Sequence, residues 1–344
     1  MPLRTPLCDL LGIEVPILSV GFGAGARPEL AAAVSNAGGL GVIGLAGGGI
    51  SLEQIAADVA TMRTLTRKPF GGNVIIVAFD SGEFDEDARA WTRERIDAAI
   101  ELRVPVLVLF WGDATPFVAP AHRAGVKVLL QVGSADEAAA AVRAGVDAVI
   151  LQGLEAGGHV RATRSLWDEL PRAIAACGKT PILAAGGIGD GRAIARALSL
   201  GAQGVSMGTR FVASAEAWAH PHYKQRIVDA SPDEAFLSKD LYYVGWPGAP
   251  HRALKNRTFA RWDAAGRPPV GKRPGEGEVI GTLHMPWGDL PWHRYQTGML
   301  TPTFDGDPED AVMWAGESVA EIRDVKPAGE IVADLVREAA ALSG

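Results

Sequence analysis

The sequence has little of the features that mark several common protein classes. Only two cysteines occur among 344 residues, which excludes a disulfide framework and a cysteine-rich metal site and fits a reducing cytoplasm. Positive charge is not in excess, since 33 lysines and arginines are outnumbered by 40 aspartates and glutamates. This balance argues against nucleic acid or an anionic membrane as a partner. No apolar run reaches the roughly 18 residues of a membrane span, and residues 1–9 lack the pattern of a secretory signal.

Short apolar runs alternate with segments of helical period up to about residue 213. This alternation predicts repeated β-α units around a parallel sheet. Eight runs are expected to be strands, at 17–20, 41–45, 74–77, 104–111, 126–132, 148–151, 181–185 and 204–207. Helices are expected between them and at 220–230, which together make a (β/α)8 TIM barrel. An open doubly wound sheet is the alternative, but residues 21–25 lack its G-x-G-x-x-G spacing.

The composition changes after residue 213, where the chain holds 12 of its 22 prolines and 6 of its 9 tryptophans. We expect a barrel over 1–230, a partly irregular helical lid or substrate-side insertion over 231–326, and a final helix over 327–344 that packs back on the barrel. Aromatic residues at 284–287 and 291–295 suggest that the insertion caps the barrel mouth and selects substrate. Stabilising packing or a subunit interface, as in a homodimer, is the alternative.

Glycines follow the seventh and eighth predicted strands. Gly186 and Gly187 come after the seventh, and Met207, Gly208 and Thr209 lie at the end of the eighth. TIM barrels often hold a phosphate between these two loops, because glycine lets backbone N–H groups approach an anion closely. The two loops together predict a phosphate-bearing cofactor.

A histidine follows the sixth predicted strand, after two glycines. Gly157 and Gly158 give a backbone that can lie close against a planar ligand, and His159 then places an imidazole at the predicted barrel mouth. An imidazole can move protons near neutral pH or donate to a developing anion. We therefore predict that His159 is catalytic; a structural histidine is the alternative.

Other predicted strand ends offer surfaces for a planar ring. Gly21 and Phe22 belong to a segment with little side-chain bulk that could pass over such a ring. Asn73 brings a carboxamide, which both donates and accepts hydrogen bonds. Gln131 and Trp111 end two further strands and are additional candidates, although a tryptophan more often packs than takes part in chemistry.

Two features that suggest chemistry have structural interpretations that we prefer. His220 and His222 have no carboxylate or third histidine at helical spacing, so no metal site is expected there. Asp190 stands directly before the predicted helix at 191–200, where it is expected to cap the helix rather than to act in catalysis.

Four segments carry a resemblance to a known family. They read AAAVSNAGGLG at 31–41, QGLEAGGH at 152–159, PILAAGGI at 181–188 and GVSMGTRF at 204–211. They resemble the nitronate monooxygenases, formerly called 2-nitropropane dioxygenases, and the resemblance runs through the whole predicted barrel. It extends to WAGESV at 314–319, which is similar to the family's closing A-G-Q-S element.

The resemblance implies a cofactor and roles for particular residues. It implies FMN, with its phosphate held at Gly186, Gly187, Gly208 and Thr209. It also implies flavin contacts from Asn73, Gln152 and Gly157, and it makes His159 the family's catalytic histidine.

The family supports three activities at one such site, and the sequence separates them poorly. A nitronate can reduce the flavin, with O2 as the oxidant and His159 as base or as partner of the nitro group. Alternatively, NAD(P)H reduces the flavin for a quinone, or the enzyme reduces an enoyl thioester. From another class, a barrel that binds a phosphorylated ligand without catalysis also remains open.

Two positions depart from the family pattern. Arg161 stands two residues after His159, where many members carry glycine, and Glu317 replaces the usual glutamine of the closing element. Arg161 and Arg164 could attract an anionic substrate or a nucleotide phosphate. A solvated surface is the alternative for both arginines.

Overall fold

Eight parallel strands form the centre of the computed structural model, which describes residues 3–47, 49–80, 86–286 and 288–342. The strands are β1 (Ile17–Ser19), β2 (Gly41–Gly44), β3 (Phe70–Ile75), β4 (Val106–Phe110), β5 (Lys127–Val132), β6 (Ala148–Gln152), β8 (Ile182–Ala185) and β9 (Gly204–Met207). They pair in the order β1-β9-β8-β6-β5-β4-β3-β2, and a parallel bridge between Leu18 and Leu40 closes the ring. The predicted TIM barrel is confirmed.

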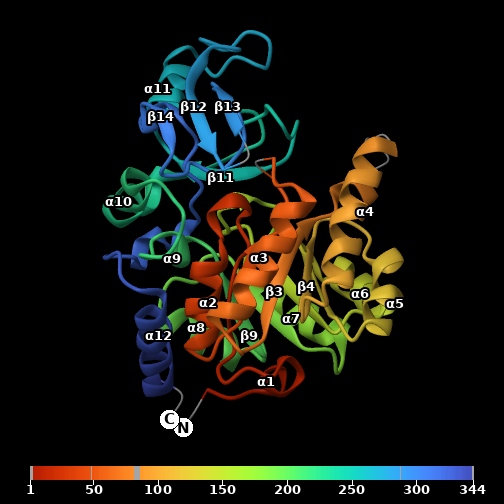
Figure 1. Ribbon diagram of the computed structural model, residues 1–344. Helices are drawn as coiled ribbons and strands as arrows, with labels where there is room; N and C mark the ends of the chain where they lie inside the picture. Colours follow the sequence, from red (N-terminus) through yellow and green to blue (C-terminus); the bar gives the residue numbers. More distant parts are fainter. Residues whose placement is uncertain (1–2, 48, 81–85, 287, 343–344) are drawn as a thin grey trace.

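Helices surround the barrel, as Figure 1 shows. The ring consists of α2 (Pro28–Asn36), α3 (Leu52–Leu65), α4 (Glu86–Glu101), α5 (Thr115–Arg123), α6 (Ala135–Ala144), α7 (Leu166–Cys177) and α8 (Gly191–Ser199). These agree closely with the segments of helical period in the sequence. The third strand was predicted too late, because it begins at Phe70 and ends at Ile75, while Val77 already lies in the short helix η2 (Val77–Phe79).

Two further helices complete the barrel: one was not expected from the sequence, and the other lies within 327–344, where a final helix was expected. α1 (Pro6–Leu11) lies below the strands, and its Leu7 and Leu11 join the inner core formed by side chains such as Leu129 and Ile150. α12 (Ala328–Leu342) packs against α8 and α2. The segment predicted as the eighth helix does form a helix, α10 (Pro221–Asp229), but α12 holds the ring position beside α8.

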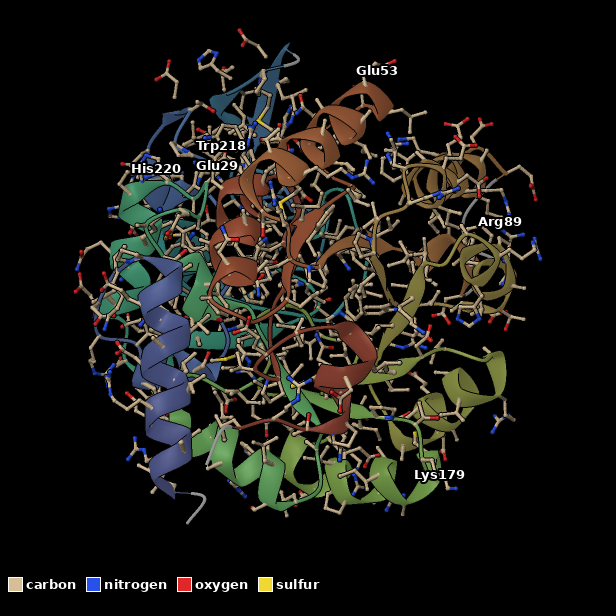
Figure 2. All side chains as sticks on the ribbon, turned by 60° about the horizontal axis from the view of Figure 1, so that its bottom comes forward. Glu29, Glu53, Arg89, Lys179, Trp218 and His220 are labelled. Carbon is tan, nitrogen blue, oxygen red and sulfur yellow. The ribbon has the colours of Figure 1, made fainter. Side chains whose placement is uncertain are left out.

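The segment before α10 runs over the start of α2. The N–H of Trp218 donates to the Gly25 carbonyl at 3.0 Å, and the Arg27 guanidinium lies 4.8 Å from the Trp218 ring centroid. Figure 2 shows Trp218 and His220 beside Glu29 of α2. After β9 and the short helix α9 (Thr209–Val212), the chain therefore crosses the outside of the barrel on its way to the lid.

The lid is built largely from short antiparallel strands that the sequence pattern did not predict. One sheet contains β10 (Ala235–Ser238), β11 (His251–Leu254) and β7 (Gly158–His159); the other contains β13 (Gly288–His293), β12 (Val279–Met285) and β14 (Phe304–Gly306). Between them in the chain lies α11 (Arg257–Ala264), and the short helices η3 (Pro232–Glu234), η4 (Pro308–Asp310) and η5 (Glu317–Glu321) complete this region. Glycine and proline within such strands weaken the alternating pattern that reveals a strand.

A buried arginine network holds the lid together. Arg294, with 2% of its surface exposed, donates through Nη1 to Asp310 Oδ1 at 3.0 Å and to Thr258 Oγ1 at 2.9 Å. Its Nη2 lies 3.0 Å from Glu278 Oε2. Since a buried charge is tolerated only when its hydrogen bonds are made, this network fixes α11 and η4 against the sheet of β12.

Candidate active site

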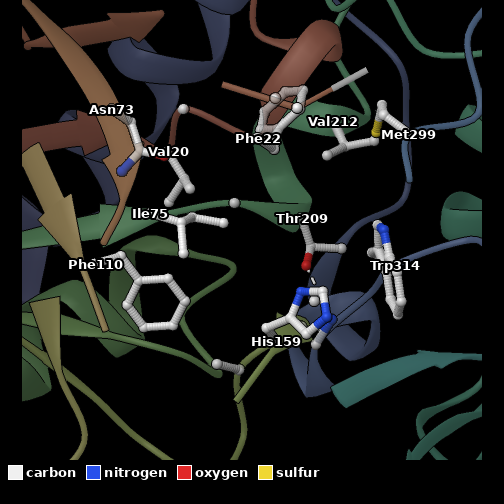
Figure 3. Close-up of a pocket in the computed structure, with 18 of the residues that line it drawn as sticks. Val20, Phe22, Asn73, Ile75, Phe110, His159, Thr209, Val212, Met299 and Trp314 are labelled. Atoms are coloured by element: carbon white, nitrogen blue, oxygen red, sulfur yellow. Dashed lines mark hydrogen bonds between the residues drawn. The ribbon is translucent and has the colours of Figure 1, made fainter. Parts of the chain in front are cut away.

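A cavity of about 400 Å³ lies at the carboxyl ends of the barrel strands, beneath the lid. This is within the usual volume range of a site for a small ligand or cofactor. It is lined by His159 and by all twelve residues that the sequence singled out for cofactor binding: Gly21, Phe22, Asn73, Gln131, Gln152, Gly157, Gly158, Gly186, Gly187, Met207, Gly208 and Thr209. Figure 3 shows Asn73, Ile75 and Phe110 facing Thr209, His159 and Trp314 across it.

Polar side chains of the strands point into the barrel mouth. Alternate residues of a strand face the same side, so Asn73 and Gln131 follow the inward-facing core residues of β3 and β5. The Nδ2 of Asn73 donates to the Val108 carbonyl at 3.0 Å, which fixes the orientation of the amide. Ser206 of β9, which the sequence analysis missed, lines the cavity with them. This arrangement supplies hydrogen-bonding groups along one face of the cavity.

Gln152 holds the segment that carries His159 in place. Its Nε2 donates to the His159 carbonyl at 3.0 Å, and its Oε1 accepts from the Arg161 N–H at 2.7 Å. The side chain is 4% exposed, so these bonds form largely away from water. The resemblance assigned Gln152 to the flavin; in the structure its amide joins the end of β6 to the backbone on either side of Val160.

The glycines after β8 and β9 form a cradle. Gly186 and Gly187 have φ values of +97° and +67°, which glycine adopts without strain. A methyl group on Gly208 would come no closer than 3.8 Å to Val20, so the cradle has open space at this position. The hydroxyl of Thr209 accepts from the Gly316 N–H at 3.0 Å, which attaches the segment after residue 313 to the same cradle.

The N-terminus of α8 is already occupied by protein carboxylates. Asp190 accepts from the Ala193 N–H at 2.9 Å, which confirms the predicted cap, and Glu338 of α12 accepts from the Gly191 N–H at 3.0 Å. An anion in the cavity therefore faces the glycine cradle rather than the end of α8.

Two other glycines of the site are required by close packing. A Cβ on Gly21 would lie 2.5 Å from the Cβ of Asn73, and a Cβ on Gly157 would lie 2.3 Å from the Gly316 nitrogen. Both approaches are closer than atoms tolerate. Gly157 thus lets the loop after β6 meet the segment at Gly316, on the edge of the cradle.

His159 is held by rings rather than by a carboxylate. Its imidazole stacks on Trp246 with centroids 4.1 Å apart and planes 32° apart, and Trp314 lies at 5.4 Å. Among the described residues its Nε2 is buried and has no hydrogen-bond partner. Burial, with a smaller contribution from His251, lowers the pKa of His159 from 6.5 to about 3. The imidazole is therefore neutral at physiological pH.

A second histidine, missed in the sequence, lies across the β-ladder from the first. His251 of β11 pairs in register with His159 of β7 and is completely buried. Its Nδ1 lies 2.8 Å from the Ala249 carbonyl, and its Nε2 accepts from the Tyr242 N–H at 3.2 Å. Only the neutral ring protonated on Nδ1 satisfies both bonds, so His251 is fixed in one tautomer. No sequence pattern pointed to it.

The two arginines near the mouth are already paired. Arg161 forms ion pairs with Asp80 and Glu137, both at 2.9 Å, and Arg164 lies 3.0 Å from Glu169. Among the described residues that line the cavity, none is a lysine, arginine, aspartate or glutamate. The cavity therefore presents polar but uncharged groups to its occupant.

Lid residues form the outer wall of the cavity. The wall is apolar and contains Leu283, Leu290, Trp292 and Met299, together with Trp246 and Trp314. Of the aromatic residues at 291–295, Trp292 lines the cavity. Trp287 lies outside the described residues. Trp111 does not line the cavity and packs behind Trp246 at 5.0 Å. The sequence around Trp246 is rich in turn-forming residues, and this pattern could have indicated that Trp246 lies in a loop.

The histidines at 220 and 222 have structural partners. The Nδ1 of His220 accepts from the His222 N–H at 3.1 Å at the start of α10, and the Nε2 of His222 lies 2.6 Å from Glu309. Across the described ranges, no cluster of three or more histidine, cysteine, aspartate or glutamate side chains is arranged to hold a metal ion.

The site suits a planar heterocycle that carries a phosphate. The open cradle at Gly208 can take the phosphate, and the amides of Asn73 and Gln131 can meet the polar edge of a ring. His159 lines the remaining volume, where a substrate would lie, and its Nε2 is buried without a partner among the described residues.

Comparison with known proteins identifies the family. The model of the nitronate monooxygenase family matches residues 4–338. The chain belongs to the nitronate monooxygenase family. It is 33% identical to a nitronate monooxygenase of Pseudomonas aeruginosa, over 96% of this chain and 97% of the relative. It is 30% identical to a (3aS,4S,5R,7aS)-5-hydroxy-7a-methyl-1-oxo-octahydro-1H-indene-4-carboxyl-CoA dehydrogenase of Mycobacterium tuberculosis, over 98% and 97%.

The structural likeness agrees with this assignment. FabK from Thermotoga maritima superimposes with a TM-score of 0.79 at 32% identity, covering 98% of this chain and 97% of the other. The protein is therefore an oxidoreductase of a family of flavin-dependent enzymes. None of the helices that the structure describes combines the length and hydropathy needed to cross a bilayer.

Proposed function

We propose that the protein binds FMN and uses it to oxidise alkyl nitronates with O2. The observation that carries the proposal is the neutral His159, which lines a cavity that also contains the glycine cradle and whose Nε2 is buried without a partner among the described residues. Gly186, Gly187, Gly208 and Thr209 would hold the phosphate, and Asn73 and Gln131 would meet the ring. When bound, FMN would supply the two-electron redox chemistry that links the nitronate to O2.

The low pKa of His159 favours one of its two candidate roles. A group with a pKa of about 3 is a weak base, so it is poorly suited to take a proton from a neutral nitroalkane. A nitronate has already lost that proton and needs only a partner for its nitro oxygens. We infer that the imidazole orients the nitro group, while Trp246 and Trp314 hold the ring and exclude water from it.

A second candidate function comes from the lid. Its apolar wall at Leu283, Leu290 and Met299 could receive the carbon skeleton of a larger substrate, and one relative is named as a carboxyl-CoA dehydrogenase. In this candidate the protein acts on a thioester, or reduces a quinone or an enoyl thioester with NAD(P)H. The uncharged lining does not distinguish these candidates, because the FMN phosphate, a nitronate and a pyrophosphate are all anions.

Anaerobic mixing tests the proposal. Purified protein should be yellow, since a colourless protein that binds no flavin would instead favour a non-catalytic ligand-binding barrel. Ethyl nitronate should bleach the visible absorbance and O2 should restore it, while NADH should leave it unchanged. Bleaching by NADH and not by ethyl nitronate would reject nitronate oxidation in favour of the reductase.

A histidine variant tests the site. His159→Ala should retain bound FMN, because the imidazole lies outside the cradle, but it should lose most turnover of ethyl nitronate. Unchanged turnover would show that another residue orients the substrate.

Two expectations from the sequence stay predictions. One is a cytoplasmic location, with which the free and buried Cys8 and Cys177 are consistent, and the other is a homodimer.

A further inference from the structure

Arg161 is fixed by both its backbone and its side chain. Its N–H donates to Gln152 Oε1 at 2.7 Å. Its Nη1 lies 2.9 Å from Asp80, which follows η2, and its Nε lies 2.9 Å from Glu137 of α6. Two carboxylates on separate elements therefore determine where the guanidinium lies, two residues beyond His159.

The guanidinium so placed lies over an indole ring. The Cζ of Arg161 is 5.1 Å from the centroid of Trp111, within the range of a cation–π contact. Trp111 directly follows β4 and has a φ of +63°, a conformation that bulky side chains rarely adopt. Such a backbone persists only where surrounding contacts hold it. Arg161 supplies one of these contacts, and Phe110 and Trp246 supply others at 5.6 and 5.0 Å.

Trp246 connects this cluster to the active site. One neighbour of its ring is Trp111 and the other is His159, at 4.1 Å. Its backbone comes from the lid, where the Val244 N–H donates to the Tyr295 carbonyl at 3.1 Å. Trp111, Trp246 and His159 thus form an aromatic column that begins at Arg161 and ends in the cavity.

We propose that Arg161 is a positioning residue that holds the ring of His159 in the cavity through the column of Trp111 and Trp246. His159 has no carboxylate to orient it, so its orientation depends on the ring against which it stacks. Displacing Trp111 would let Trp246 move and would change the direction of the His159 nitrogen. This inference rests on the proposed function only for the role of His159 in turnover.

Arg161→Gln tests the proposal against a matched control. The variant removes the cation above Trp111, and Arg164→Gln removes a neighbouring arginine whose charge pairs with Glu169. With ethyl nitronate, Arg161→Gln should lower kcat by about 10- to 100-fold with little change in KM, because a small misplacement of a catalytic group has effects of this size. Arg164→Gln should retain the wild-type kcat. A wild-type kcat in Arg161→Gln would overturn the proposal.

A double-mutant cycle separates positioning from general destabilisation. If Arg161 acts through Trp111, then adding Arg161→Gln to Trp111→Leu should lower kcat no further than Trp111→Leu alone. Independent, multiplicative losses would overturn the proposed route. Arg161→Lys preserves a charge for Asp80 and Glu137 but not the planar guanidinium. Compared with Arg161→Gln, it should restore folding but recover only part of the lost kcat.

Readouts without substrate distinguish failure of this proposal from failure of the proposed function. Near-ultraviolet circular dichroism reports the asymmetric packing of Trp111 and Trp246, and it should weaken in Arg161→Gln but not in Arg164→Gln. Hydrogen exchange of the backbone at 244–250 should become faster in the same variant. Unchanged spectra and exchange would overturn the positioning role, whereas an inactive wild type with these changes present would contradict only nitronate oxidation.

Discussion

Glu317 Oε1 lies 3.0 Å from Nη2 of Arg252, and this ion pair joins η5 to strand β11. Arg252 also donates to the carbonyls of Ala235 and Leu154 and is almost fully buried, while Glu317 is half-exposed. Since β11 pairs with β7, the ion pair helps to fix the strand that carries His159. It also gives a partner to the residue that departs from the family's usual glutamine.

We expect Glu317→Gln to have a small effect on stability. Glutamine can still accept from Arg252, and exposed ion pairs contribute little, so the free energy of unfolding should fall by less than about 1 kcal/mol. Arg252→Met should cost about 2 kcal/mol or more, because two buried carbonyls lose their donor. Urea unfolding measures both changes. Equal losses in the two variants would contradict this division.

Gly208→Ala should weaken cofactor binding without harming the fold. A Cβ there has ordinary contacts, the nearest at 3.8 Å, so the methyl group would occupy the cradle rather than clash with the protein. We expect the apoprotein to melt at the wild-type temperature and FMN to bind at least about 10-fold more weakly, as one lost close contact of 1.4 kcal/mol would produce.

Gly329→Ala is the control for this substitution. Gly329 lies in α12, and a Cβ there would come no nearer than 3.9 Å to Ala37. Because alanine favours a helix over glycine by about 1 kcal/mol, this variant should be slightly more stable and should bind FMN normally. Fluorescence titration of the apoproteins with FMN measures the affinities. Equal affinities in both variants would contradict the proposal that the cradle binds the phosphate.

The lowered pKa of His159 makes stability depend on pH in a defined window. In the unfolded chain His159 takes up a proton below pH 6.5, whereas in the folded protein it stays neutral down to about pH 3. The contribution of His159 to the free energy of unfolding should therefore be complete above pH 6.5. As the pH falls below 6.5, this contribution should decrease by about 1.4 kcal/mol per pH unit. His251, whose pKa is also lowered by burial, adds to the slope.

Urea unfolding of His159→Gln between pH 4 and 8 isolates this contribution. The variant should lose part of the slope below pH 6.5 and should run parallel to the wild type above pH 7. In the wild type, kcat/KM should show no break near pH 6.5, because His159 stays neutral there. A break at that pH that disappears in the variant would mean that His159 titrates normally.

Leu290→Ala tests the lid wall. Leu290 lines the cavity from β13, so shortening it should raise KM for 1-nitrohexane nitronate by about 10-fold, within the range for lost apolar contacts, and should affect ethyl nitronate less. Leu237, exposed in β10 and outside the cavity, offers the control Leu237→Ala. Steady-state oxygen consumption measures both, and equal KM changes for the two nitronates would place the substrate elsewhere.

Prediction from the sequence succeeded where local pattern and long-range structure agree. Each barrel strand is an apolar run, and most helices of the ring end near a glycine or a polar turn, so their bounds could be read closely. The residues predicted to bind a cofactor lie at or directly after the ends of these strands, and in a TIM barrel strand ends converge by construction. For that reason Gly186, Gly208 and His159 could be placed in one cavity before any coordinates were known.

Prediction failed where the deciding contacts are distant in sequence. The lid strands contain glycine and proline and gain stability from the buried Arg294 network, which no local pattern reveals. The ring position beside α8 was expected for residues 220–230 but is taken by α12, which reaches it because the chain returns from the lid. Trp246 and His251 become part of the site because β11 pairs with the two-residue strand β7.

The barrel, its order of strands and the residues at the strand ends could be derived from the amino-acid sequence, because they follow from periodicity and from the closure of parallel β-α units. The protonation state of His159 depends instead on contacts that form when the chain folds. Its neutral imidazole results from burial between Trp246, Trp314 and His251, three residues that are distant from it in the sequence. Desolvation depends on what surrounds a group in space, and sequence neighbours do not specify that.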